Sequence, residues 1–307
     1  MGNEIGNTSQ FLFYASDDGG VKVQVIVQDE TVWATQKGMA EIFDVEPNTI
    51  TYHLKNIFVS KELESNSVTR KIRATAADGK SYLTSFYNLD AIISVGYRVN
   101  SSKATTFRKW ATGILKEYLI KGFAMNDDRL KQGGNLFGKD YFNELLERIR
   151  EIRASERRFY QKITDLYAQA SIDYDKDAPI THTFYASVQN KFHYAIHGHT
   201  AAELIQTRAN ASKPNFGLTS WKNEHTRGKV LKSDVNIAKN YLTEDELKAM
   251  NRVVSQYLDF AEGMAERQKA MTMADWVRKL DDFLQFNEYG ILSGFGKVSA
   301  SDARKFA

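Results

Sequence analysis

The stretch TQKGMAEIFDVEPNTITYHLKNIF, residues 35–58, contains two short amphipathic segments on either side of a polar corner. Thr35 is a suitable N-cap for the first segment, and Pro47 suits the first turn of the second, where its missing N–H costs no hydrogen bond. Ile50 and Leu54 are four residues apart, so on a helix they share the face that packs against the first segment. The pattern predicts a helix-turn-helix.

Two further segments have the pattern of β-hairpins. Residues 10–28 contain the strands QFLFYA and VKVQVIVQ on either side of DDGG. Residues 67–87 contain SVTRKIRAT and KSYLTSFY, with Asp78 and Gly79 at the expected tip. We therefore expect an α+β domain in which hairpins precede and follow the helix pair.

The second hairpin is basic on one face. In its first strand Arg70 and Ile72 alternate with Lys71 and Arg73. A basic hairpin after a helix-turn-helix is the winged arrangement, in which the second helix enters the major groove of DNA and the wing contacts phosphates. The alternative is an ordinary α+β core whose hairpin only covers the two helices. The winged helix-turn-helix interpretation predicts DNA contacts from Asn48, Thr49, Thr51, Tyr52, Lys55, Arg70, Lys71, Arg73, Arg108 and Lys109.

Length and composition set the broad class. The 307 residues are enough for two domains, and 42% hydrophobic with 26% charged residues is typical of a globular protein. The absence of cysteine excludes disulfides and thiolate metal sites and favours a cytoplasmic protein. No apolar run approaches the ~20 residues of a membrane-spanning helix, and no signal peptide is recognisable. The net charge of +3 alone does not indicate a nucleic-acid partner.

The glycine-rich stretch 126–140 divides the chain. We expect a winged helix-turn-helix-like domain over 1–125, a linker over 126–140 and an all-helical domain over 141–307 that serves oligomerisation or partner binding. Just before the linker, a helix over 104–121 is expected to bury a stripe of apolar side chains. That stripe consists of Phe107, Trp110, Ile114 and Tyr118.

In the second domain, residues 141–170 are predicted to form a single long helix. Its apolar stripe, which includes Ile149, Ile152, Phe159 and Ile163, is longer than a short neighbouring helix can cover. We therefore expect a homodimer that buries the remainder of the stripe. Capping boxes at Thr200 with Glu203 and at Thr243 with Glu246 predict the starts of two further helices.

No signature of a cofactor or metal is present. His193 and His197 lie four residues apart, but Tyr194 stands where a metalloprotease has its glutamate, and Gly198 ends the helix, so we expect no metal site. Glycine-rich phosphate loops are absent, and we expect no cofactor. One loop, residues 212–222, combines an aromatic with polar groups, and it either contacts a ligand or partner or is held by its apolar residues. If the loop contacts a ligand or partner, the predicted contact residues are Lys213, Asn215, Thr219, Ser220, Trp221 and Lys222.

Several longer strings resemble the RhuM family of virulence-associated proteins. They are VWATQKGMAEIFDVEPNTITYHLKNIF, TAADGKSYLTSFYNLDAIISVGYRVNSSKATTFRKWAT, LKEYLIKGF, KPNFGLTSWK, AKNYLTEDEL and MTMADW. The stretch from Tyr87 to Trp110 is also similar to the DNA-binding N-terminal domains of BRO-type phage antirepressors. The resemblance implies an intracellular protein linked to a mobile element or virulence locus, and it brings no established catalytic residues.

Three functions remain open on the sequence alone. The leading hypothesis is a regulatory protein that binds double-stranded DNA as a homodimer. The second is an enzyme that acts on nucleic acid or nucleotides, with its catalytic residues in the helical domain. The third is a protein-binding effector that keeps the helix-turn-helix fold without DNA contact.

Overall fold

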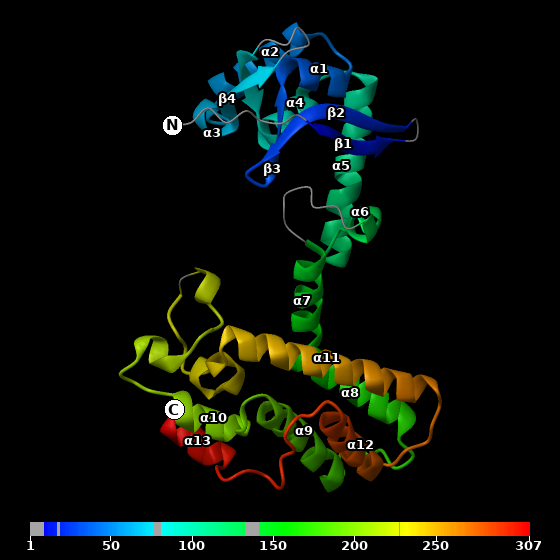
Figure 1. The fold of residues 1–307 in the computed structure, drawn as a ribbon, viewed down its shortest axis with the longest axis vertical. Coiled ribbons are helices and arrows are strands. Elements are labelled where there is room, and N and C mark those ends of the chain that lie inside the picture. The colour runs from blue at the N-terminus through cyan, green and yellow to red at the C-terminus, as the bar shows by residue number, and fades with distance from the viewer. Residues whose placement is uncertain (1–8, 17–18, 76–80, 133–140, 227) are drawn as a thin grey trace. The chain divides into compact units, whose positions relative to one another are not determined.

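The computed structural model describes the chain except for residues 1–8, 17–18, 76–80, 133–140 and 227 (Figure 1). The chain divides into two compact units, residues 1–141 and 142–307. The first unit combines a sheet with helices, and the second consists of helices and loops with one isolated β-bridge. The predicted α+β class is confirmed.

The sheet of the first unit contains five strands that pair antiparallel in the order β1-β2-β3-β5-β4. They are β1 (Ser9–Ser16), β2 (Gly19–Gln28), β3 (Thr31–Thr35), β4 (Thr69–Thr75) and β5 (Ser81–Tyr87). The strands of both predicted hairpins are therefore confirmed. The second hairpin's expected tip, with Asp78 and Gly79, lies outside the described residues.

The helices of the first unit follow from local signals in the sequence. They are α1 (Gln36–Phe43), α2 (Pro47–Val59), α3 (Ser65–Val68), α4 (Leu89–Arg98), α5 (Ser102–Lys121) and α6 (Asp127–Gln132). Thr35 caps α1 by accepting a hydrogen bond from the N–H of Gly38 at 3.0 Å, and Pro47 opens α2. Asp44 makes the corner between the two helices with φ 54° and ψ 58°, a conformation that aspartate tolerates better than most residues. Ile50 is fully buried. The expected helix pair is present.

The two faces of the sheet differ in what covers them. Val25, Ala34 and Tyr87 are buried in a cluster with side chains of α1, α2, α4 and α5, so the helices cover this face. On the other face Ile26, Trp33, Ile72 and Phe86 form a small cluster of their own. Because of this second cluster, Ile26 is buried, although the alternation of β2 had placed it among polar residues.

Helix α5 packs closely on α4 only along its first half. A Cβ at Gly96 would lie 2.7 Å from ring atoms of both Phe43 and Phe107, so glycine allows the close approach. Beyond Trp110 the predicted burial is wrong, because Ile114 is 41% exposed and Tyr118 is 56% exposed. The periodicity of the sequence located the apolar stripe of α5 correctly, but it could not show where other elements stop packing against it.

The second unit is built from seven α-helices and four short 3₁₀ helices in its described residues. These are α7 (Tyr141–Arg153), α8 (Glu156–Ala170), α9 (Pro179–His197), α10 (Ala201–Arg208), η1 (Pro214–Gly217), η2 (Glu224–Thr226), η3 (Asp234–Asn236), η4 (Ala238–Tyr241), α11 (Glu244–Glu266), α12 (Met273–Phe286) and α13 (Ala300–Phe306). Both capping boxes predicted from the sequence are present.

The single helix expected over residues 141–170 is wrong. Ser155 has an extended backbone, φ −63° and ψ 138°, which ends the helical path and serves as the N-cap of α8. Phe159 and Ile163 on α8 are 4% and 0% exposed within the unit's own core, whereas Ile149 and Ile152 on α7 are exposed. The stripe is therefore two separate stripes with different surroundings.

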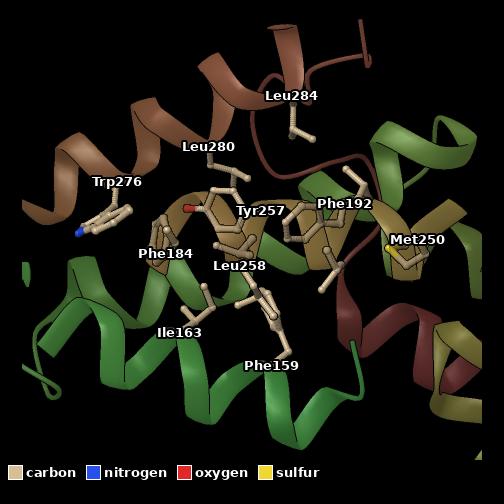
Figure 2. Close-up of a cluster of buried hydrophobic side chains, with 14 of the residues drawn as sticks. Phe159, Ile163, Phe184, Phe192, Met250, Tyr257, Leu258, Trp276, Leu280 and Leu284 are labelled. Carbon is tan, nitrogen blue, oxygen red and sulfur yellow. The ribbon is translucent and has the colours of Figure 1, made fainter. Parts of the chain in front are cut away.

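Aromatic and aliphatic side chains from α8, α9, α11 and α12 form the core of the second unit (Figure 2). Trp276 is fully buried, and its indole N–H donates to the hydroxyl of Ser171 at 3.0 Å. The hydroxyls of Tyr167 and Tyr257 are 2.7 Å apart, so each buried phenol has a partner. The unit therefore has a well-packed centre of its own.

Candidate nucleic-acid interface

Helix α2 presents a polar face to solvent. Ile50 and Leu54 are buried against the rest of the unit, so the positions between them point outward. Asn48, Thr51, Tyr52 and Lys55 are exposed, Tyr52 at 62%, and Thr49 is half-buried. These side chains include the hydrogen-bonding types that read base edges in a major groove.

The β4–β5 hairpin directs Lys71 and Arg73 to the helix-covered side of the sheet. Thr69 pairs with Tyr87, and residues paired across two strands share a face, so Thr69 lies on the side where Tyr87 is buried among helices. Lys71 and Arg73 follow at two-residue intervals and therefore lie on the same side. Both are exposed and have no partner among the described residues.

A short chain of hydrogen bonds joins this side of the sheet to α2. The side-chain amide of Gln36 donates to the hydroxyl of Tyr87 at 2.9 Å. The hydroxyl of Thr51 lies 3.1 Å from Gln36 Oε1 and 3.1 Å from the carbonyl oxygen of Pro47, two acceptors for its one proton. The first turns of α2 are thus held beside the base of the β4–β5 hairpin, on the sheet side that carries Lys71 and Arg73. We call the exposed side chains of α2 together with these two cations the α2–hairpin face.

Besides Thr51, two of the cations expected to contact DNA, Arg70 and Arg108, have partners within the fold. The guanidinium of Arg70 pairs with Asp29 at 2.6 Å and lies 4.6 Å from the centre of the Trp33 ring, on the sheet face opposite the helices. Both contacts join residues that are far apart in the sequence, so no local pattern could have indicated them.

Arg108 completes the C-terminus of α4. It donates to the carbonyl oxygens of Gly96 at 3.0 Å and Val99 at 2.9 Å, which lack acceptor roles inside the helix. The neighbouring Lys109 is exposed and carries no such contact among the described residues. Gln36, in contrast, was not expected from the sequence, because its importance comes from partners on two other elements.

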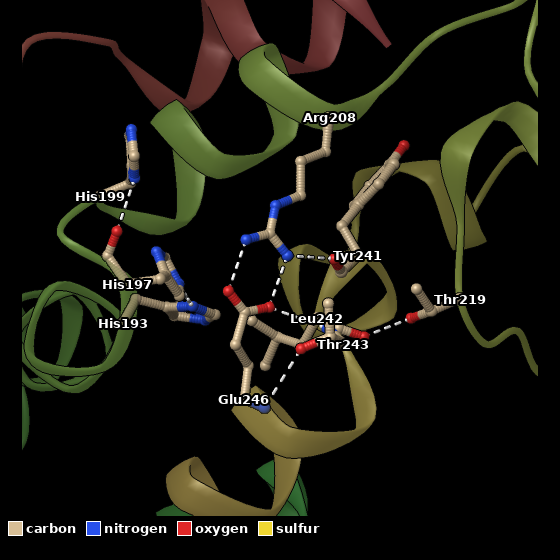
Figure 3. A network of polar contacts seen from close by, with 9 residues as sticks. All are labelled: His193, His197, His199, Arg208, Thr219, Tyr241, Leu242, Thr243 and Glu246. Carbon is tan, nitrogen blue, oxygen red and sulfur yellow. Dashed lines mark hydrogen bonds and ion pairs between the residues drawn. The ribbon is translucent and has the colours of Figure 1, made fainter.

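The second unit also contains a polar cluster, but its members are paired with one another (Figure 3). Arg208 donates to both carboxylate oxygens of Glu246 at 2.5 and 2.6 Å and to the carbonyl oxygen of Tyr241 at 2.7 Å. Glu246 also accepts the backbone N–H of Thr243 at 2.8 Å. The Arg208 hydrogen bond is the main reason that the pKa of Glu246 falls to about 2. The cluster ties α10 to the start of α11.

The histidine pair lies beside this cluster (Figure 3). His193 Nδ1 and His197 Nε2 are 3.1 Å apart, and burial lowers the pKa of His193 to about 3 and that of His197 to about 4. The carboxylate of Glu203 already accepts the N–H groups of Thr200 and Lys297. No group of three or more metal-ligating side chains occurs among the described residues.

The loop that had been considered for ligand binding is held by its own hydrogen bonds. The hydroxyl of Thr219 is placed to donate to the carbonyl oxygens of Asn240 and Leu242, and the indole of Trp221 donates to Gly228 at 2.8 Å. Leu218 is buried, whereas Phe216 is 47% exposed and does not anchor the loop. Lys213, Asn215 and Lys222 are exposed and Ser220 is half-buried.

Comparisons with known proteins identify one family. A model described as the virulence protein RhuM family matches residues 67–307, which include the β4–β5 hairpin and the whole second unit. No curated protein and no solved structure shows a significant match. Within the described part of the chain, none of the helices has both the length and the apolarity that crossing a membrane requires.

Proposed function

The chain belongs to the RhuM family of virulence proteins, and we propose that its first unit binds double-stranded DNA in a regulatory role. In this proposal α2 lies in the major groove and the β4–β5 hairpin lies along the phosphate backbone, as in winged helix-turn-helix proteins. A locus on a mobile element is the expected setting for such a protein.

The observation that carries the proposal is the hydrogen-bonded link through Gln36. It holds the polar side of α2 next to a hairpin whose two cations without a partner among the described residues, Lys71 and Arg73, lie on the same side of the sheet. A DNA duplex presents base edges in its groove and phosphates along the neighbouring rim, so one docked helix and one flanking hairpin fit the two kinds of contact.

The roles within the α2–hairpin face follow from side-chain chemistry. Asn48 and Tyr52 are suited to base edges and sugar-phosphate oxygens, and Lys55 to a phosphate at the groove edge. Thr51 is suited only to accept a hydrogen bond, because its proton is used within the fold. Lys71 and Arg73 are suited to phosphates. Arg70 and Arg108 are left out of the revised interface, because their guanidinium groups already have partners within the fold.

The test measures binding of the full chain to a random-sequence duplex over a range of salt concentrations, by fluorescence anisotropy. Lys71→Ala with Arg73→Ala should weaken binding to every duplex and reduce the slope of log K against log salt by about 1.8, or about 0.9 per contact. Lys176→Ala with Arg304→Ala removes the same charge from exposed sites of the second unit and should leave the slope unchanged.

An electrophoretic shift with the same duplex separates the rival functions. Retardation of an intact duplex with and without Mg²⁺ supports binding, whereas loss of the duplex only with Mg²⁺ supports a nuclease. No retardation at low salt, or equal slopes for both double variants, would refute the proposed interface.

A further inference from the structure

The second half of α5 exposes an unusual number of large apolar side chains. Ile114 and Leu115 are 41% and 55% exposed, and Tyr118 and Leu119 are 56% and 72% exposed. Monomeric proteins rarely expose apolar patches beyond a few hundred Å², and larger ones mark interaction sites. Three more large apolar residues that are 47–72% exposed follow directly along the chain: Ile120, Phe123 and Met125.

Four of these side chains, Ile114, Leu115, Tyr118 and Leu119, lie along one side of the helix, whereas Ile120 points to the opposite side and Phe123 and Met125 follow the end of α5. Ala111, Leu115, Tyr118 and Gly122 are spaced by four, three and four residues, the spacing of a coiled-coil seam. At about 100° per residue, Ile114 and Leu119 flank that seam, one on each side. We call these six residues the α5 seam.

The charged residues of this stretch lie outside the centre of the seam. Lys116 points to the opposite side of the helix, whereas Glu117 and Lys121, which pair at 2.8 Å, border the seam on its Ile114 side. An apolar centre with charged residues at its edge is the arrangement of an interface core and its polar rim.

We propose that the α5 seam is the surface through which two copies of this chain form a homodimer. The exposed apolar side chains together present on the order of several hundred Å², the scale that each partner contributes to a stable interface of about 800 Å² per side. A second copy is the partner that is always present at the same concentration and carries the same seam, so pairing is self-complementary.

This surface replaces the one expected from the sequence. Phe159 and Ile163 on α8 are in the core of their own unit and cannot form a dimer contact without unfolding it. Ile149 and Ile152 on α7 remain exposed, and they provide a matched control for the α5 seam.

The first test is the mass of the full chain by light scattering, without DNA, at high micromolar concentration. Wild type should have twice the 34.9 kDa chain mass. Leu115→Glu with Leu119→Glu should give a monomer with an unchanged circular dichroism spectrum, because both residues are exposed. Ile149→Glu with Ile152→Glu should stay a dimer.

A second test uses the absence of cysteine from the chain. Single variants Ala111→Cys, Leu115→Cys and Tyr118→Cys place one thiol at a time on the seam, and at least one should give a disulfide-linked dimer on mild oxidation. Lys116→Cys, on the opposite side of the helix, should not. A monomeric wild type, a dimer broken by the α7 variant but not by the α5 variant, or cross-linking only through Lys116→Cys would each overturn the proposal. None of these measurements depends on DNA binding.

Discussion

On the α2–hairpin face, Lys71 and Arg73 are exposed and have no partner in the described part of the chain, whereas Arg208 in the second unit is held by Glu246 and Tyr241. Charges of the first kind add little to folding and remain free for a ligand. Charges of the second kind are partly buried and hold elements together. Substituting the first kind should therefore weaken binding with little loss of stability, whereas substituting the second kind should lower stability.

The largest effect on the free energy of unfolding is expected from removing a charged side chain that has partners within the fold. Arg208→Ala leaves the carboxylate of Glu246 and the carbonyl of Tyr241 without their donor and should lower the free energy of unfolding by about 2–3 kcal/mol. Urea unfolding measures it. Arg278→Ala removes an exposed arginine paired with Asp275 and should change the unfolding free energy by less than about 0.5 kcal/mol. If Arg208→Ala changed the unfolding free energy as little as Arg278→Ala, the proposed difference between paired and exposed charges would be refuted.

Acid should weaken the second unit through the same region. The pKa of His193 is about 3 in the folded chain and 6.5 ordinarily, so between these values the unfolded chain binds an extra proton and stability falls as pH falls. The slope should approach about 1.4 kcal/mol per pH unit for this imidazole between pH 6 and 4. Glu246, with a pKa of about 2, adds to the loss only below its ordinary value of 4.5.

Urea unfolding at several pH values and fixed salt tests this slope. His193→Gln should reduce the slope by about half, because His197, with a pKa of about 4, keeps its own contribution. His182→Gln, at an exposed site, should leave the slope as in wild type. An equal pH dependence in both variants would mean that His193 is not the source.

Arg70 gives an intermediate case within the first unit. Its pair with Asp29 and its contact with Trp33 are about half exposed, so Arg70→Ala should cost no more than about 1 kcal/mol of unfolding free energy. The salt dependence of DNA binding should not change. A reduced salt slope would place Arg70 in the DNA interface and would mean that one side chain can serve both binding and folding.

The smallest effect on stability is expected from the α2–hairpin face itself. Lys71→Ala with Arg73→Ala should change the unfolding free energy by less than about 0.5 kcal/mol, since neither side chain has a partner to lose among the described residues. The same protein sample should show weakened DNA binding. A large loss of stability would mean that these cations support the fold.

Local signals predicted the elements well, because their causes lie within a few residues. Thr35 as an N-cap, Pro47 at the start of α2 and the capping box at Thr243 each depend on neighbours three or fewer positions away. The break at Ser155 was missed, because neither glycine nor proline marks it and the surrounding residues keep helical periodicity.

Contacts between distant segments were beyond the sequence alone. The role of Arg70 depends on Asp29, forty-one residues earlier, and the link through Gln36 depends on Tyr87, fifty-one residues later. For the same reason the apolar stripe of α5 could be located but not its surroundings. Periodicity shows which side of a helix is apolar, and only the fold shows what covers it.

The bond from Arg208 to the carbonyl of Tyr241 spans thirty-three residues, and the described residues between them form short 3₁₀ helices but no longer helix or strand. This arrangement closes a loop at its two ends with one side chain. The entropy of closing a flexible loop rises slowly with length, by about 0.6 kcal/mol for each doubling. Insertions or deletions at exposed positions of this segment without a hydrogen bond among the described residues, such as at Lys229, should therefore change folding little. Length variation within the family is expected to concentrate there, while the residues that close the loop stay constant.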